Sequence, residues 1–133
     1  MSKPITCLNA AAAVIALSWP LLTGLVSAAT PAADSAEAGK RAFVVCSACH
    51  SVDGSAKSTG PTLKGIVGRK AAADLAYKTY SKALQASAIT WSTAELDAYL
   101  KAPGQRVKGT TMMVNAGDPK RRLAIIRYLE TLK

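Results

Sequence analysis

The apolar residues of this 133-residue chain recur at helical spacing, and no useful run of period-two alternation is present. The pattern is clearest near the C-terminus, where Asp118 is expected to cap a helix and Pro119 to take its first position. The side chains expected to face inward from this helix are Leu123, Ile125, Ile126 and Leu129. The chain is therefore predicted to be all-α.

Two more helices are predicted from their capping residues. Asp34 or Ser35 is placed to cap a helix that runs from about Ala36 to Cys46. The segment Ser92-Thr93-Ala94-Glu95 has the pattern of a capping box and predicts a second helix, which Pro103-Gly104 is expected to end.

Long loops separate these helices. Residues 51–62 are rich in Ser, Gly and Lys, residues 64–78 contain two glycines, and residues 105–117 are rich in turn-forming types. A short helix around Ser81 to Ala86 is expected after the second of these loops. Loops of this length are unusual in a small domain unless they surround something, so we expect a buried cofactor.

The N-terminal segment has the pattern of a secretory signal. The chain is apolar and uncharged from Leu8 to Val26, and small residues follow at Ala28 and Ala29. We expect cleavage to remove residues 1–29 and to leave residues 30–133 as one domain without stable membrane insertion. The alternative is an uncleaved membrane anchor, because roughly 18 apolar residues can cross a bilayer.

The chain is basic, with a formal net charge of +9. Nucleic acid, anionic lipid and acidic proteins are therefore the partners to consider. The basic residues are scattered along the sequence, and no run resembles a nucleic-acid-binding arm. An acidic protein is the expected partner, and nucleic acid is not.

The segment Cys46-Ser47-Ala48-Cys49-His50 carries the strongest chemical signal in the sequence. This C-x-x-C-H spacing is typical of covalent haem attachment, in which two thiols bind the porphyrin edge and the histidine binds iron. A zinc site and a thiol–disulfide pair are the alternatives. A closed zinc site needs four ligands, and beyond the motif the predicted mature chain has no further cysteine or histidine. A thioredoxin-like pair belongs to a β-rich framework that is not predicted here.

The sixth iron ligand must come from another residue type, because His50 is the only histidine. Met112 and Met113 are the only methionines beyond the predicted signal, and both lie in the loop that follows Gly109. A thioether from either residue can complete the coordination of iron.

The order of these motifs resembles that of the class I cytochromes c, over residues 35–133. The matching segments are Gly39 and Phe43 before the Cys-His motif, Gly60-Pro61-Thr62-Leu63, Tyr80-Ser81, Ile89-Thr90-Trp91, Tyr99-Leu100 with Pro103, and Gly109-Thr110-Thr111-Met112. The resemblance implies three to five helices with long loops wrapped around one haem c, attached through two thioethers.

The resemblance also implies a role for individual residues. Met112 would be the axial ligand opposite His50, and the Pro61 carbonyl would accept a hydrogen bond from the imidazole. Tyr80 and Trp91 would donate to a haem propionate. Gly39 and Tyr128 would meet where the first and last helices cross. The ligand loop departs from the family pattern at Lys108, Thr111 and Val114, which leaves open which partner docks there.

The function implied is that of a soluble, monomeric one-electron carrier in the periplasm, and not an enzyme. Its exposed haem edge, ringed by Lys57, Lys70, Lys82 and Lys108, would dock on acidic patches of respiratory oxidases, reductases or dehydrogenases. The alternatives are a haem sensor or peroxidase-like protein with an open sixth position, and a dedicated cytochrome subunit of one dehydrogenase. If the signal is not cleaved, the domain would be anchored to the membrane and face the periplasm.

Overall fold

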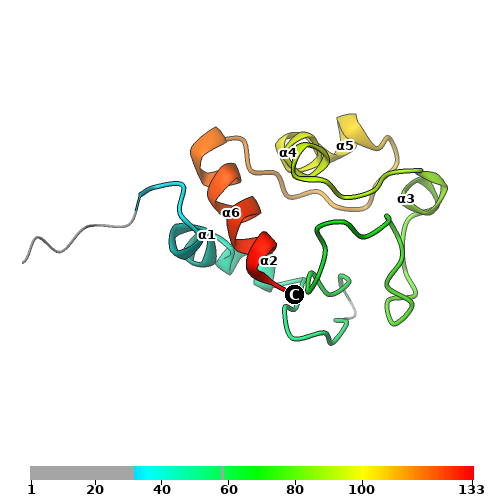
Figure 1. The fold of residues 1–133 in the computed structure, drawn as a ribbon. Helices are drawn as coiled ribbons and strands as arrows, with labels where there is room; N and C mark the ends of the chain where they lie inside the picture. The colour runs from blue at the N-terminus through cyan, green and yellow to red at the C-terminus, as the bar shows by residue number, and fades with distance from the viewer. Residues whose placement is uncertain (1–31, 58) are drawn as a thin grey trace, which may run out of the picture.

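The fold is all-α, as predicted, in a computed structural model that describes residues 32–57 and 59–133. The helices are α1 (Ala36–Ala42), α2 (Val44–Ser47), α3 (Lys82–Ala86), α4 (Thr93–Lys101), α5 (Pro103–Arg106) and α6 (Pro119–Thr131) (Figure 1). Among the described residues, the only strand-like pairing is an isolated bridge between Lys70 and Thr90. The predicted signal segment, residues 1–29, lies outside the described residues. No helix in the part of the chain described here is both long and apolar enough to cross a membrane.

The N-terminal helix forms where it was predicted but is interrupted at Phe43. Ser35, and not Asp34, is the cap, because its side chain accepts a hydrogen bond from the Ala38 amide at 3.1 Å. At Phe43 the helix tightens, and the Cys46 amide donates to the Phe43 carbonyl at 2.8 Å, a spacing of three residues. This break, together with the separate turn of α5, gives six helical segments among residues 32–57 and 59–133, where three to five were expected.

The start of α4 agrees with the prediction, whereas the segment after it does not. The Ser92 side chain accepts from the Glu95 amide at 3.1 Å, so half of the capping box forms. The Glu95 carboxylate does not complete the box and instead pairs with Arg106 at 2.6 Å. Pro103 does not simply end the helix but opens α5, because proline suits a first helical position where no amide donor is needed. The predicted loop 105–117 therefore begins only after Arg106.

The C-terminal helix α6 begins as predicted. The Asp118 carboxylate accepts hydrogen bonds from the amides of Lys120 and Arg121, at 3.1 and 3.4 Å. Its buried face contains Arg122, Ala124, Ile125, Ile126 and Leu129. The prediction that Leu123 points inward was wrong, since that side chain is 39% exposed. The neighbouring Ala124 is buried instead, and its backbone carbonyl lies against Gly39 of α1.

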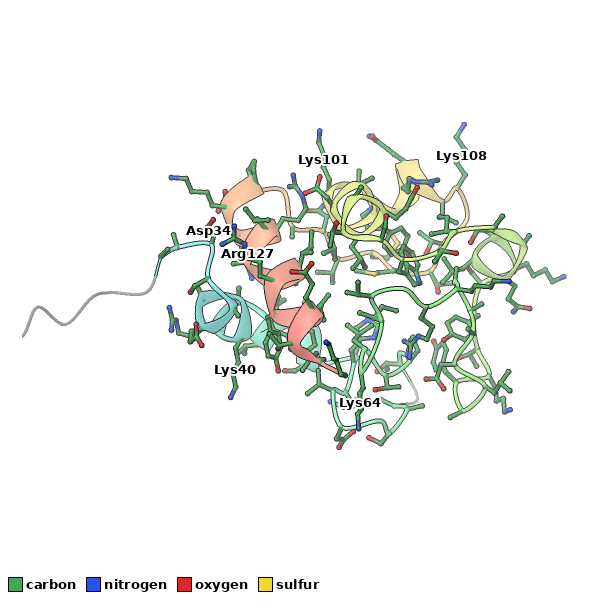
Figure 2. All side chains as sticks on the ribbon, in the orientation of Figure 1. Asp34, Lys40, Lys64, Lys101, Lys108 and Arg127 are labelled. Atoms are coloured by element: carbon green, nitrogen blue, oxygen red, sulfur yellow. The ribbon has the colours of Figure 1, made fainter. Side chains whose placement is uncertain are left out.

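The crossing of α1 and α6 forms the centre of the fold. Figure 1 shows α6 lying across α1, with α4 and α5 on one side of the molecule and the loops before α3, residues 51–57 and 59–80, on the other. At Gly39, an added Cβ would lie 1.9 Å from the Ala124 carbonyl oxygen and 2.8 Å from the Tyr128 Cβ. Asp34 pairs with Arg127 at 3.3 Å beside the same crossing (Figure 2). The predicted meeting of Gly39 and Tyr128 is thus confirmed.

We predict that Gly39→Ala lowers the free energy of unfolding by about 3 kcal/mol, because the methyl group forces the two helix backbones apart. Gly104→Ala is the matched control, since nothing lies within 4 Å of a Cβ at that position. The control should leave stability unchanged or raise it by up to about 1 kcal/mol. The free energies of unfolding of the two variants are measured by urea unfolding followed by circular dichroism. Equal values for Gly39→Ala and Gly104→Ala would contradict the close crossing.

Candidate functional site

The Cys-His segment forms a tight turn at the end of α2. The amides of Cys49 and His50 both donate to the Cys46 carbonyl, at 3.1 and 2.9 Å. Cys46 and Cys49 are half-buried and not joined to each other. Burial raises the pKa of the Cys46 thiol, against the opposite effect of the Arg121 charge. The turn thus presents two thiol side chains and an imidazole within five consecutive residues.

One hydrogen bond fixes the state of His50. Its Nδ1 lies 2.8 Å from the Pro61 carbonyl oxygen, and a carbonyl can only accept. Nδ1 therefore carries the proton, and Nε2 keeps the lone pair that a metal requires. Burial lowers the pKa of His50, as does the Lys57 charge, while the hydrogen bond to Pro61 acts in the opposite direction. The result is a neutral imidazole with a defined tautomer.

Gly60 allows the Pro61 loop to approach the histidine this closely. An added Cβ at Gly60 would lie 2.7 Å from the Cys49 carbonyl oxygen and 2.8 Å from both Cε1 and Nδ1 of the imidazole. Any side chain here would push the ring or the loop away. The sequence pointed to the Gly60-Pro61 turn but not to this steric role.

A cavity of about 330 Å³ lies beside the Cys-His turn. Its lining includes every side chain expected at the site, which are Cys46, Cys49, His50, Pro61, Tyr80, Trp91 and Met112. These residues come from α2, from the loops on either side of α3, and from the loop before α6. The fold therefore brings together residues from most of the chain around one space.

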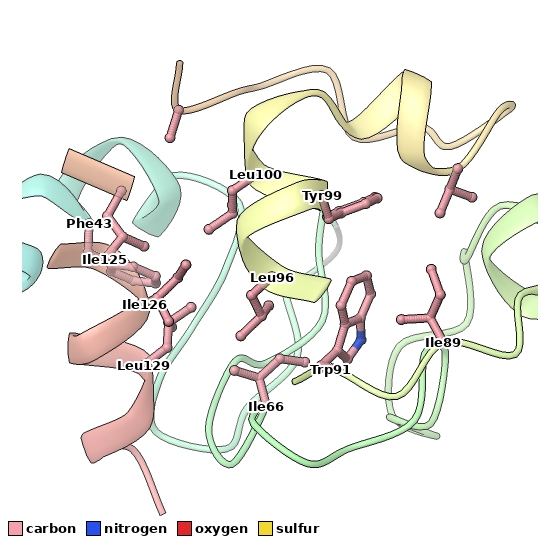
Figure 3. Close-up of a cluster of buried hydrophobic side chains, with 12 residues drawn as sticks. Phe43, Ile66, Ile89, Trp91, Leu96, Tyr99, Leu100, Ile125, Ile126 and Leu129 are labelled. Carbon is pink, nitrogen blue, oxygen red and sulfur yellow. The ribbon is translucent and has the colours of Figure 1, made fainter. Parts of the chain in front are cut away.

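The walls of this cavity are core side chains. Phe43, Ile66, Trp91, Leu96, Tyr99, Leu100, Ile125 and Leu129 belong both to the cavity lining and to the buried cluster (Figure 3). Such an apolar lining with a few polar groups fits a flat, largely apolar macrocycle. The residues present therefore fit a haem, whose apolar face would complete the core of this small domain.

The two methionines differ in burial. Both line the cavity, but Met113 is 85% exposed, whereas Met112 is half-buried and packs against the core. The Met112 amide donates to the Thr110 hydroxyl oxygen at 3.3 Å, and that oxygen lies 2.6 Å from the Tyr99 hydroxyl. The segment between α5 and α6, residues 107–118, carries both methionines and is called the methionine loop below. Tyr99, which the sequence indicated only as a residue of the helix α4, thus holds the start of this loop in place.

Three side chains that line the cavity carry hydrogen-bond donors, namely Trp91, Tyr80 and Arg69. Trp91 is buried, and its ring lies 4.9 Å from that of Tyr99 (Figure 3). Burial raises the pKa of Tyr80, so its hydroxyl stays protonated and able to donate. Arg69 also lines the cavity, and its guanidinium donates to the carbonyls of Thr62 and Lys64, at 2.5 and 3.1 Å. Sequence reasoning missed Arg69, because nothing in the local pattern distinguished it from the scattered basic residues.

Comparison with known proteins agrees with this architecture. The family model described as cytochrome c matches residues 36–133. Cytochrome c-550 of Nitrobacter winogradskyi is 49% identical over 58% of this chain and 71% of its own length. Cytochrome c2 of Rhodomicrobium vannielii is 37% identical over 79% of this chain and 85% of its own.

The fold is also that of solved cytochromes. The structure of cytochrome cH from Methylobacterium extorquens is 42% identical, has a TM-score of 0.68, and covers 73% of this chain and 98% of its own. These relatives are electron-carrying cytochromes, so the sensor or peroxidase-like alternative is not supported. The chain belongs to the cytochrome c family, and it is a monohaem electron carrier with a covalently attached haem c and redox proteins as partners.

Proposed function

We propose that Cys46 and Cys49 would hold the haem through thioethers and that His50 and Met112 would bind its iron. The observation that carries this assignment is the lining of a single cavity by both thiols, the imidazole and the half-buried thioether. The bond from Nδ1 to the Pro61 carbonyl supports it, because Nε2 is then free to bind iron. When bound, the haem supplies an iron atom that gains or loses one electron.

Burial favours Met112 over Met113 as the second ligand. A ligand on a buried metal must itself be held inside, and Met113 projects into solvent with 85% exposure. Met112 packs against the core, and its amide is tied to Thr110. A thioether ligand in an apolar cavity favours the reduced iron and raises the potential. If His50 and Met112 both bound the iron, oxygen or peroxide could bind it only by displacing one of them.

Tyr80, Trp91 and Arg69 are assigned to the haem propionates. A carboxylate taken out of water needs hydrogen-bond donors and positive charge to offset its lost hydration. The tyrosine hydroxyl and the indole N–H supply donors, and the guanidinium supplies charge at the same cavity. Arg69 is already fixed by two backbone carbonyls, so it needs little further ordering to serve this purpose.

Partner docking takes place where the cavity lining reaches the surface. Val45, Met113 and Val114 line the cavity and are exposed, which gives this region an apolar centre. Lys70 lies at the cavity as well, while Figure 2 shows other lysines projecting from several elements. A monomer with this surface suits brief, charge-steered contacts with acidic patches on oxidases, reductases or dehydrogenases.

The periplasm is the proposed location. Residues 1–29 have the pattern of a secretory signal, and covalent haem attachment is completed outside the cytoplasm. If the segment is not cleaved, it anchors the domain to the membrane with the haem facing the same compartment. The identity of the first residue of the purified protein distinguishes a cleaved signal from an uncleaved anchor.

We predict that Met112→Ala removes the weak red absorption band of a methionine–iron bond from the oxidised protein and lets the reduced protein bind carbon monoxide. Met113→Ala is the matched control and should keep the band, because this neighbouring thioether is exposed. Visible spectra of both variants test this prediction. Loss of the band in Met113→Ala alone would reverse the assignment.

We also predict that reduction of an acidic redox partner slows about tenfold as ionic strength rises from about 10 mM to about 300 mM, since salt screens charge steering. Lys70→Gln should slow the low-salt reaction more than Lys40→Gln, which alters an exposed lysine of α1 outside the cavity. Stopped-flow absorbance measures both effects. A salt-independent rate, or a complex that survives gel filtration, would favour a dedicated subunit of one enzyme.

A further inference from the structure

A buried arginine holds the far end of the methionine loop. Arg122 lies in α6 and is only 6% exposed. Its Nε donates to the Asp97 carboxylate at 2.6 Å, and one of its terminal nitrogens donates to the carbonyls of Ala116 and Gly117, at 2.9 and 3.1 Å. The side chain therefore connects α6, α4 and the loop that precedes α6.

This arrangement explains why a charged residue lies on the apolar face of α6. A buried guanidinium is costly unless its donors are satisfied and its charge is balanced. Asp97 balances the charge from a half-exposed position, with 47% of its side chain accessible. The planar guanidinium of an arginine can donate hydrogen bonds to a carboxylate and two carbonyls at once, in a fixed geometry. A lysine ammonium makes such hydrogen bonds with a less defined geometry.

Both ends of the methionine loop are thus tied to α4. At the start, the Tyr99 hydroxyl bonds to Thr110, two residues before Met112. At the end, the Ala116 amide donates to the Leu100 carbonyl at 2.7 Å, and Arg122 secures the Ala116 and Gly117 carbonyls. Between these anchors, residues 113–115 are exposed. Apart from Met112, this part of the loop has little packing of its own, so its position depends on the anchors.

We propose that Arg122, oriented by Asp97, is a positioning residue that keeps the Met112 thioether in the cavity and sets how often it leaves the iron. This inference rests on the proposed ligand role of Met112. Release of the thioether requires the loop to open locally, and such opening is governed by the contacts that are lost in it. If the anchor at Ala116 and Gly117 is weakened, the open population rises.

Imidazole binding to the oxidised holoprotein measures this open population. An external ligand can take the sixth position only when Met112 has left, so its apparent affinity rises in proportion to the open fraction. The red band reports the same exchange, since it disappears as imidazole replaces the thioether. Global stability is followed separately by circular dichroism in urea.

The variants are chosen to weaken the anchor to different degrees. We expect Arg122→Lys to raise imidazole affinity about tenfold, the effect of losing one charge-assisted hydrogen bond. Asp97→Asn keeps an oxygen acceptor but removes the charge, and should raise the affinity about threefold. Glu95→Gln is the matched control, because Glu95 lies in the same helix as Asp97 and its ion pair, with Arg106 of α5, is at the surface. Its affinity should equal that of the unaltered protein.

The outcomes separate this inference from the proposed function. If the unaltered protein has no red band, the ligand role of Met112 fails, and the positioning role fails with it. If the band is present but Arg122→Lys and Asp97→Asn bind imidazole like Glu95→Gln, only the positioning role is overturned. The same holds if they lose global stability without any gain in imidazole affinity. If Arg122→Lys does not fold, Asp97→Asn decides the question, because it leaves both carbonyl contacts of Arg122 in place.

Discussion

At the crossing of α1 and α6, the backbone of Gly39 lies against the Ala124 carbonyl with no side chain between them. The rest of the structure depends on this contact. The chain continues from α1 into α2, which carries Cys46, while α6 carries Ile125 and Leu129 into the cavity lining. Because the helices touch directly, the Cys-His turn is held at a fixed place relative to the C-terminal helix. A cofactor site assembled from distant segments needs such a fixed reference.

The cavity and the hydrophobic core are one structure in this protein. The same side chains that bury each other, such as Phe43, Leu96 and Leu100, also line the space beside the cysteines. A domain of this size buries little apolar surface by itself, so a haem supplies part of what a larger core would provide. Residues 59–61 of the long loop after α2 line the same space, so a bound haem would contact this loop as well as the core side chains.

Helix α4 shows how similar ion pairs serve different purposes. Glu95 pairs with Arg106 at the surface, where solvent screening leaves little net stabilisation. Asp97 pairs with Arg122, which is buried and also holds two loop carbonyls. Both pairs have the same 2.6 Å separation, and burial and the additional hydrogen bonds distinguish them. The second pair links the ligand loop to the core, whereas the first joins only α4 to the adjacent turn.

The sequence by itself determined the features that depend on neighbouring residues. The spacing of Cys46, Cys49 and His50, the caps at Ser92 and Asp118, and the all-α class all follow from local chemistry and periodicity. Tertiary structure decided the rest. Whether Leu123 or Ala124 faces the core, and whether Met112 or Met113 is buried, depends on contacts with distant elements. Arg69 and Arg122 looked like ordinary basic residues, because a guanidinium gains its role only from the carbonyls and carboxylates that the fold brings to it.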